Sequence, residues 1–287
     1  MKTTLYQYRI PLKDYCTYGI GGPAKEFVIV HTKDELKEVV SDCYLNQKRY
    51  LVIGKGSNCL FDDKGFNGLV VVNRIQEIDW QDNKVIAGGG YSFSLLGIQA
   101  SRKGYTGLEF ASGIPGSVGG AVWMNAGAGG AETKDSLIEV EFLHEEGRVE
   151  TIEPKNFSYR SSPFQSMKGV IVSATFRLSR GSDAKEKQEK LLAYRMGTQP
   201  YKSKSCGCVF RNPEGDSAGR IIDSLNLKGL EQGGAKVSEE HANFIVNQKQ
   251  ASASDILELI RYVQMKVKLS TNIHLEPEVR WIPYDDN

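Results

Sequence analysis

Two cysteines flank a single glycine in the segment SKSCGCVFRNPEG, residues 203–215. Thiols at this spacing are compatible with a zinc site, a disulfide, a proton donor or nucleophile, or two small buried side chains. Cys206 and Cys208 stand just before a Phe-Arg-Asn-Pro run that is typical of a tight, polar turn. The sequence has no second close cysteine pair and no His-x3-His pair, so we expect no metal site.

The composition is that of an ordinary globular protein. The residues are 40% hydrophobic and 25% charged. At 287 residues, the chain is long enough for one large domain or two to three smaller ones. Lys and Arg number 36 and Asp and Glu number 35, so no overall field would attract nucleic acid or an anionic membrane. An anionic ligand would have to be held by a local site.

The N-terminal sequence MKTTLYQYRIPLKDY lacks the apolar stretch of a secretory signal. No apolar run approaches the roughly 18 residues of a membrane-spanning helix. We therefore expect a cytoplasmic protein whose five cysteines are thiols. A monomer is the simplest expectation for its assembly.

Local patterns predict an α+β protein with at least two domains. Thr32 and Glu35 form a capping box before a helix over about 33–48, on which Cys43 faces the core. The charged segment SRGSDAKEKQEKLLAYR is expected to form a solvated helix, mostly a linker, and marks a change in composition with a domain boundary near 180–195. Further helices are expected near 92–103, 217–225 and 254–269, and strands near 50–54, 69–73, 84–88, 138–143, 148–152, 169–178 and 273–282.

Glycine is concentrated in three segments: TYGIGGPA (17–24), VIGKGSNCL (52–60) and SGIPGSVGGAVWMNAGAGG (112–130). Such loops let backbone N–H groups approach a phosphate, because no side chain intervenes. GIGGPA fits the dinucleotide-binding pattern only formally, since no apolar strand precedes it and Pro23 stands where a helix should begin. The sequence has no P-loop motif either. Together the three segments favour a diphosphate-containing cofactor held by loops.

The order of the motifs resembles that of one flavoenzyme family. As in the UDP-N-acetylenolpyruvoylglucosamine reductases of bacterial peptidoglycan synthesis, the chain carries in order TYGIGG, GKGSN, GLEFASGIPGSVGGAVWMNAGA, YRSSPF, GCVFRNP, LKGLEQGGAKVSEEHANFIVN and LEPEVRW. The resemblance covers nearly the whole chain, is closest to the compact form of the family, and implies the FAD-binding fold of the vanillyl-alcohol oxidase type with a separate α+β substrate-binding domain. The implied divisions are 1–190 for FAD (subdomains of about 1–67 and 68–190), 191–270 for the substrate, and 271–287 as a C-terminal strand returning to the active site.

The resemblance implies reduction of UDP-N-acetylglucosamine enolpyruvate to UDP-N-acetylmuramate by NADPH. Hydride addition to the β-carbon places negative charge on the α-carbon and its carboxylate, which then need a cation and a proton. Arg160 in SYRSSPF matches the family's arginine, whose fork suits a carboxylate. Glu278 in LEPEVRW matches the family's catalytic glutamate, while Glu276 is interpreted as a surface carboxylate.

The proton donor is where the sequence departs from the usual family pattern. Cys208 stands where the family usually has serine, and Arg211 replaces a lysine. A thiol has a reference pKa of about 8.5, so it is mostly protonated at neutral pH yet is a better acid than an alcohol. The change to cysteine therefore preserves the role of proton donor to the α-carbon. We expect Cys206 to be a small packed or partly exposed thiol.

The cofactor implied by the resemblance is non-covalent FAD. Two other interpretations stay open: another flavin oxidoreductase of this fold, such as an oxidase, and a protein that binds a flavin or nucleotide sugar without catalysis. The first is disfavoured because no His or Cys in the glycine-rich loops suggests covalent flavin attachment, and the second because three catalytic candidates occur in separate motifs. The residues implied for FAD are Gly54, Lys55, Gly56, Ser57, Asn58, Gly113, Ile114, Pro115, Gly116, Ser117, Gly119, Gly120, Asn125 and Tyr159, and those for the UDP-sugar are Tyr201, Lys202, Arg211, Asn212 and His241.

Overall fold

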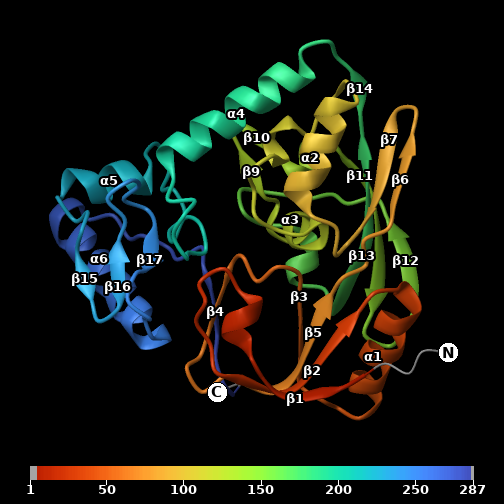
Figure 1. Ribbon diagram of the computed structural model, residues 1–287, viewed down its shortest axis with the longest axis horizontal. Coiled ribbons are helices and arrows are strands. Elements are labelled where there is room, and N and C mark those ends of the chain that lie inside the picture. The colour runs from red at the N-terminus through yellow and green to blue at the C-terminus, as the bar shows by residue number, and fades with distance from the viewer. Residues whose placement is uncertain (1–4, 286–287) are drawn as a thin grey trace. The chain divides into compact units, whose positions relative to one another are not determined.

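A computed structural model describes residues 5–285 of the chain (Figure 1). The chain forms two compact units, and the expected α+β class is confirmed. Unit 1 comprises residues 5–7, Phe27–Lys55 and Gly68–Arg195; unit 2 comprises Tyr8–Glu26, Gly56–Asn67 and residues 196–285. This division describes compactness and not ligand binding, so the domain limits inferred from the sequence stay a prediction. Within the described residues, no helix is both long and apolar enough to cross a bilayer.

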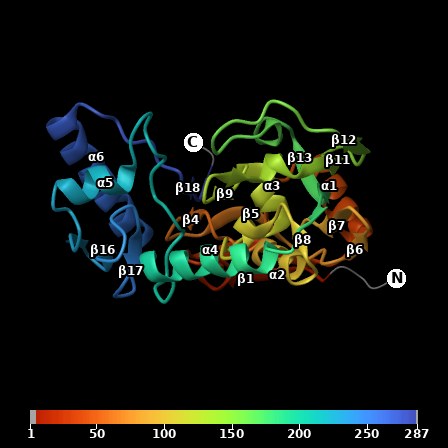
Figure 2. The ribbon, with the colours of Figure 1, turned by 90° about the horizontal axis from the view of Figure 1, so that it is seen from above.

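A five-stranded antiparallel sheet organises unit 1, with the order β12-β11-β13-β7-β6. Helix α3 packs on β13 and β7, as Figures 1 and 2 show. Ser92 caps α2 as the sequence predicts, whereas α3 lies inside the glycine-rich block and was not expected there. The elements are β6 (Ile78–Gln81), β7 (Lys84–Gly88), α2 (Phe93–Arg102), α3 (Val118–Met124), β11 (Leu137–His144), β12 (Val149–Ile152) and β13 (Gly169–Arg177).

A four-stranded sheet has the order β1-β2-β5-β3, in which β3 and β5 are parallel. The capping box of Thr32 and Glu35 opens α1, and Cys43 is buried on that helix, so both predictions are confirmed. Pro23 begins a strand rather than a helix, in agreement with the rejected dinucleotide-binding motif. The elements are β1 (Gln7–Pro11), β2 (Pro23–Val30), α1 (Lys33–Leu45), β3 (Tyr50–Ile53) and β5 (Phe66–Asn73).

Short pairs and turns complete unit 1, and a charged helix follows them. The helix α4 (Ala184–Thr198) carries ion pairs one turn apart, Lys187 with Asp183 at 2.8 Å among them. Only two of its residues, Ala184 and Gln188, are buried, which fits the charged, solvated helix predicted there. The remaining elements of unit 1 are β8 (Tyr105–Thr106), η2 (Glu109–Ala111), β9 (Gly127–Ala128), β10 (Ala131–Glu132), η3 (Thr133–Asp135), η4 (Pro163–Gln165) and β14 (Ser179–Arg180), and η1 (Leu12–Tyr15) belongs to unit 2.

Unit 2 is built around α6 (Ala253–Thr271). Its apolar stripe is buried as the helical spacing predicts: Ile256, Leu259, Ile260, Val263 and Val267. A three-stranded antiparallel sheet has the order β15-β16-β17, and β4 pairs with β18 in parallel. The other elements are β4 (Cys59–Phe61), α5 (Ala218–Ser224), β15 (Glu231–Gln232), β16 (Ala235–Val237), β17 (Ile245–Asn247) and β18 (Arg280–Ile282).

The C-terminal strand is shorter than expected. The sequence predicts a strand over 273–282, but only Arg280–Ile282 forms one. Upstream, Pro277 makes an isolated β-bridge with Phe210. Proline has no N–H to donate to a ladder, so regular pairing cannot run through this residue.

Candidate active site

The expected site residues divide between the two units. Within unit 2 the backbone brings Cys208 and Glu278 onto neighbouring segments, whereas Arg160 belongs to unit 1. Unit 1 also contains Gly54, Lys55, Gly113, Ile114, Pro115, Gly116, Ser117, Gly119, Gly120, Asn125 and Tyr159; unit 2 also contains Gly56, Ser57, Asn58, Tyr201, Lys202, Arg211, Asn212 and His241.

Close backbone packing explains several of the unit 1 glycines. A Cβ on Gly54 would lie 1.9 Å from Ser117 Oγ, and one on Gly89 would lie 2.4 Å from the carbonyl oxygen of Ile171. Ser117 also forms an isolated β-bridge with Ser92, so the starts of α2 and α3 are adjacent. No larger residue fits at position 54 without moving the serine.

The glycine-rich loop is held by its own hydrogen bonds. Gly113 has φ of +85°, the left-handed region that favours glycine, and its N–H donates to Ser94 Oγ at 2.8 Å. Gly120 is exposed, and a Cβ there would meet only Ser117 Oγ, at 3.5 Å. The backbone N–H groups of Ile114, Gly116 and Gly119 donate to protein carbonyls. The loop is therefore a preformed surface, and a phosphate needs other groups to balance its charge.

Lys55 supplies positive charge beside this surface. Its Nζ donates to Ser92 Oγ at 2.7 Å, and Ser92 is the N-cap of α2. Burial and the nearby Arg74 both lower the pKa of Lys55. The half-buried ammonium thus lies near a guanidinium and the positive end of a helix. A bound anion would reduce the repulsion between these positive charges. These groups fit the diphosphate of the implied cofactor.

Arg160 occupies the corner of a two-residue turn. The N–H of Ser158 donates to the carbonyl of Ser161 at 3.2 Å, and the N–H of Ser161 donates back at 3.0 Å. Arg160 has φ of +54°, which costs free energy for a residue other than glycine. Its guanidinium lies over the ring of Tyr159 at 4.9 Å and donates to the Gly127 carbonyl at 3.4 Å. The backbone pairing of Ser158 with Ser161 thus places Arg160 in a tight turn.

Asn125 holds this turn in place. It is fully buried, ends α3 in the left-handed conformation, and its Nδ2 donates to the Ser158 carbonyl at 2.9 Å and to Glu132 at 3.1 Å. Its Oδ1 accepts from the Lys134 N–H at 3.1 Å. Gln165, which the sequence did not single out, donates to the Arg160 carbonyl at 3.1 Å. These bonds give Asn125, expected to contact the cofactor, a visible role in positioning the arginine turn.

Antiparallel backbone bonds join the segments of Cys208 and Glu278. The N–H of Glu278 donates to the Val209 carbonyl at 2.7 Å, and the N–H of Arg211 donates to the Glu276 carbonyl at 2.9 Å. Glu278 is partly buried, and its Oε2 is shielded from solvent. Two residues more than 60 positions apart are therefore placed in one small region of unit 2.

Cys206 is a packed thiol, as expected. Its Sγ lies 3.3 Å from the Cys59 carbonyl oxygen and 3.6 Å from Thr17 Oγ1. Burial raises its pKa well above the ordinary value, and burial likewise raises the pKa of Cys59 to about 11. Gly207 has φ of +77°, so the chain between the two cysteines is not a regular strand. Cys206 therefore anchors this segment on the backbone at Cys59.

The remainder of the GKGSN motif supports the same region of unit 2. Asn58 Nδ2 donates to the Glu278 carbonyl at 3.1 Å, so this residue helps to hold the carboxylate segment. Gly56 has φ of +60°, and a Cβ there would lie 2.3 Å from the Tyr15 carbonyl oxygen. Glycine at position 56 is therefore required by its packing against Tyr15 and Cys16, and Ser57 beside it is partly buried.

Arg211 is the expected substrate residue with the clearest ligand-binding feature. Its Nη1 lies 3.8 Å from Glu276 Oε2. Its Nε is buried without a hydrogen-bond partner among residues 5–285. A buried donor of this kind costs free energy unless a ligand or water accepts its proton. Tyr201 and Lys202 are exposed nearby in sequence.

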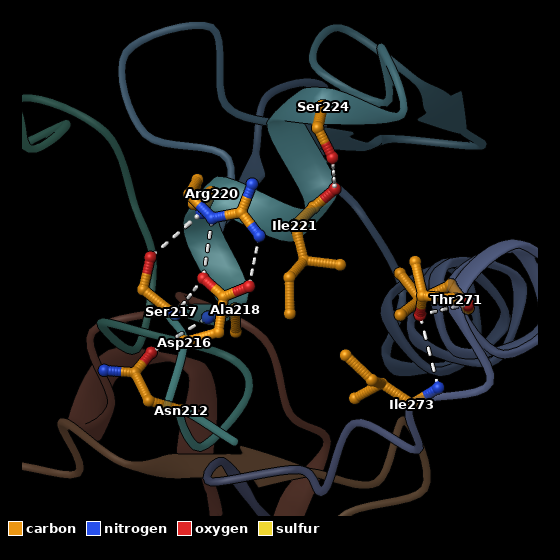
Figure 3. Close-up of polar contacts among 10 residues, drawn as sticks. Asn212, Asp216, Ser217, Ala218, Arg220, Ile221, Ser224, Thr271 and Ile273 are labelled. Atoms are coloured by element: carbon orange, nitrogen blue, oxygen red, sulfur yellow. Dashed lines mark hydrogen bonds and ion pairs between the residues drawn. The ribbon is translucent and has the colours of Figure 1, made fainter. Parts of the chain in front are cut away.

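Asn212 and His241 both contact parts of α5. Asn212 Oδ1 accepts from the Ala218 N–H at 3.0 Å, and Figure 3 shows Asn212 beside the helix start. His241 packs against Gly219, whose Cβ would lie 3.1 Å from His241 Cε1. Its Nδ1 accepts from the Asn243 N–H at 3.2 Å. Both residues thus have structural contacts, and a role in binding the UDP-sugar stays a prediction.

Some residues of the site were missed by the sequence analysis. The sequence analysis assigned no role to Arg74, Gln165 or Asn243, because a single Arg, Gln or Asn forms no recognisable motif. Asn243 lies within the quoted motif LKGLEQGGAKVSEEHANFIVN, which is the only pointer the sequence offered.

Comparisons with known proteins identify relatives over the full length. Residues 199–282 match the family described as "UDP-N-acetylenolpyruvoylglucosamine reductase, C-terminal domain", and residues 24–153 match "FAD binding domain". Proteins called UDP-N-acetylenolpyruvoylglucosamine reductase are 53% identical in Protochlamydia amoebophila and 49% identical in Chlamydia muridarum, each over 98% of this chain and 95% and 96% of theirs. A crystal structure of UDP-N-acetylenolpyruvylglucosamine reductase from Thermus caldophilus is 39% identical, with a TM-score of 0.83 over 98% of this chain and 100% of that one.

Replacing Lys55 with methionine should weaken FAD binding about 10- to 100-fold, because a charge-assisted contact to the diphosphate is lost. The ammonium is lost as pH rises through its lowered pKa, so wild-type affinity should fall at a lower pH than that of Lys55→Arg. Quenching of flavin fluorescence during FAD titration of the apoprotein measures both effects. Lys168→Met, at an exposed lysine of unit 1, is the control, and wild-type affinity in Lys55→Met would contradict the assignment.

Replacing Asn125 with glycine should loosen the arginine turn. Glycine accepts the left-handed backbone, so only the side-chain bonds are removed. We expect faster trypsin cleavage after Arg160 and a loss of about 1–3 kcal/mol in the free energy of unfolding, measured by peptide mapping and urea denaturation. Asn272→Gly, at the left-handed C-cap of α6, is the matched control. Unchanged cleavage in Asn125→Gly would show that the amide does not hold the turn.

Proposed function

The chain belongs to the UDP-N-acetylenolpyruvoylglucosamine reductase family, and on that premise we propose that it reduces UDP-N-acetylglucosamine enolpyruvate to UDP-N-acetylmuramate with NADPH. It is an FAD-dependent oxidoreductase with the FAD-binding fold of the vanillyl-alcohol oxidase type, as the sequence predicted. The observation that carries the proposed chemistry is the backbone pairing of Val209 with Glu278, which joins the thiol segment to the carboxylate segment.

The proposed reaction requires contributions from both the cofactor and the protein. FAD, when bound, would supply hydride transfer from NADPH to the β-carbon of the enolpyruvyl group. Lys55 and the loop of residues 113–120 would hold it, since their charge and packing fit a diphosphate. The protein must stabilise negative charge at the substrate carboxylate and deliver a proton to the α-carbon.

Arg160 is proposed to bind the substrate carboxylate. A guanidinium stays charged and can donate two parallel hydrogen bonds to a carboxylate. This interaction strengthens as negative charge develops on the carboxylate. The turn of Ser158 and Ser161, to which Asn125 is bonded, fixes the backbone that carries the arginine. The Tyr159 ring and the Gly127 carbonyl contact its guanidinium.

Cys208 is proposed to protonate the α-carbon, and Glu278 to assist in charging or protonating the carboxylate of the intermediate. Cys206 is not proposed as the donor, because its thiol is buried and donates to the Cys59 carbonyl. Arg211, with its buried Nε, supports binding of the anionic UDP-sugar. The proposed setting is peptidoglycan precursor synthesis by a monomer in the cytoplasm.

The role of Cys208 separates the two halves of the reaction. In Cys208→Ala, NADPH should bleach the flavin at the wild-type rate, because this step needs no proton from the thiol. Recovery of the flavin colour on anaerobic addition of the enolpyruvyl substrate should be about 10²–10⁴-fold slower, the usual contribution of a general acid. Stopped-flow absorbance measures both rates.

The controls for this experiment are the neighbouring thiol and a hydroxyl. Cys208→Ser should be substantially active, and Cys206→Ala should retain the wild-type ratio of the two rates. Thiol alkylation should inactivate the wild type, spare Cys208→Ser, and be slowed by bound UDP-sugar. Normal colour recovery in Cys208→Ala would remove the thiol from the mechanism.

Arg160 and Glu278 should affect turnover without affecting FAD content. Arg160→Lys keeps the charge but loses the two-pronged geometry, and Glu278→Gln loses the ionisable group. We expect losses of about 10²–10⁴-fold in turnover for each, with the flavin-to-protein absorbance ratio unchanged. Glu276→Gln, on the same segment as Glu278, should lose less than about threefold. Near-normal turnover in both variants would contradict the proposed roles.

A further inference from the structure

The side chain of Asn243 is bonded to both peptide groups of Phe210. The Phe210 N–H donates to Asn243 Oδ1 at 2.9 Å, and Asn243 Nδ2 donates to the Phe210 carbonyl at 2.8 Å. A residue of a neighbouring strand makes the same pair of bonds in an antiparallel ladder. The amide therefore takes the place of a strand, two residues beyond Cys208.

The opposite edge of this segment is occupied by the C-terminal residues. The Val209 carbonyl accepts from Glu278, and the Arg211 N–H donates to Glu276. The Val209 N–H donates to the Asn243 carbonyl at 2.8 Å. Both peptide groups of Val209 and of Phe210 are thus hydrogen-bonded, and Asn243 provides three of the bonds.

Gly207 precedes Cys208. This glycine has φ of +77°, and a Cβ on it would meet nothing within 4 Å. Beyond it, Cys206 is anchored on the Cys59 carbonyl. Gly207 thus contributes no side-chain contact before Cys208, whereas the peptide groups after it are fixed by hydrogen bonds.

The side chain of Asn243 bonds to Phe210 because the backbone around Asn243 turns away from Phe210. The Phe244 N–H donates to the His241 carbonyl at 2.9 Å, and the Asn243 N–H donates to His241 Nδ1. Residues 241–244 therefore cannot run on as a strand beside Phe210. Asn243 is only 2% exposed, so water cannot readily replace its two side-chain bonds.

We propose that Asn243 is a positioning residue that sets the location of the Cys208 thiol for proton delivery. The inference rests on the proposed role of Cys208 as the donor. A displacement of the donor by about 1 Å can slow a reaction about 10²-fold. Loss of the amide should therefore affect the proton-delivering half of the reaction and spare the half that NADPH drives.

The test is a double-mutant cycle on the holoenzyme. Asn243→Leu removes both side-chain bonds at similar volume, and we expect colour recovery with the enolpyruvyl substrate to slow about 10- to 100-fold, with NADPH bleaching within about threefold of wild type. In the Cys208→Ala background, Asn243→Leu should cause no further slowing, because it acts through the thiol. Asn243→Ser is the second variant if the leucine variant gives too little folded enzyme.

A readout without catalysis accompanies these rates. Hydrogen exchange, followed by mass spectrometry of peptides that cover 206–212, should accelerate in Asn243→Leu. Asn247→Leu is the matched control: Asn247 also uses both ends of its amide, on Tyr18 and Ala251, but neither lies in the Cys208 segment. It should leave exchange over 206–212 and the ratio of the two half-reaction rates unchanged.

The outcomes separate this inference from the proposed function. Normal colour recovery in Asn243→Leu, equal slowing of both half-reactions, or further slowing in the Cys208→Ala background would overturn the positioning role. Normal colour recovery in Cys208→Ala would instead refute the donor assignment, whatever Asn243 does.

Discussion

The hydrogen bonds between the Val209–Arg211 segment and the Glu276–Glu278 segment are the constraint on which the arrangement of the proposed site in unit 2 depends. Neither segment is a regular strand, because Pro277 cannot donate and Gly207 has a positive φ. Each buried peptide group must nevertheless find a partner. The hydrogen bonds between the two segments, together with the buried amide of Asn243, satisfy that requirement and place the Cys208 segment beside the Glu278 segment.

Unit 1 also contains an irregular backbone segment that is hydrogen-bonded by a buried asparagine. Arg160 lies on a strained turn, and Asn125 donates to the carbonyl that precedes this turn. In both units a side chain proposed to act in the reaction is carried by irregular backbone. In each case the amide of a buried asparagine is hydrogen-bonded to this backbone, since one amide can donate and accept at once.

The glycine segments owe their composition to packing as much as to a ligand. Gly54 leaves room for Ser117, and Gly56 leaves room for the backbone of Tyr15. The loop N–H groups at 113, 114, 116 and 119 are used within the protein. The group in this part of unit 1 whose charge agrees with the anionic diphosphate of FAD is instead the ammonium of Lys55, whose pKa is lowered by burial and by the nearby Arg74.

The sequence by itself determined the α+β class, most helices and strands, and the family, because periodicity, caps and motif order are local properties of the chain. Thr32 and Glu35 capped α1, and the apolar stripe of α6 was buried, as those patterns require. Only the tertiary structure decided the short C-terminal strand, the helix α3 among glycines, and the partners of Asn125 and Asn243. Those features depend on backbone groups far apart in the chain, whose need for hydrogen-bond partners leaves no periodic trace in the sequence.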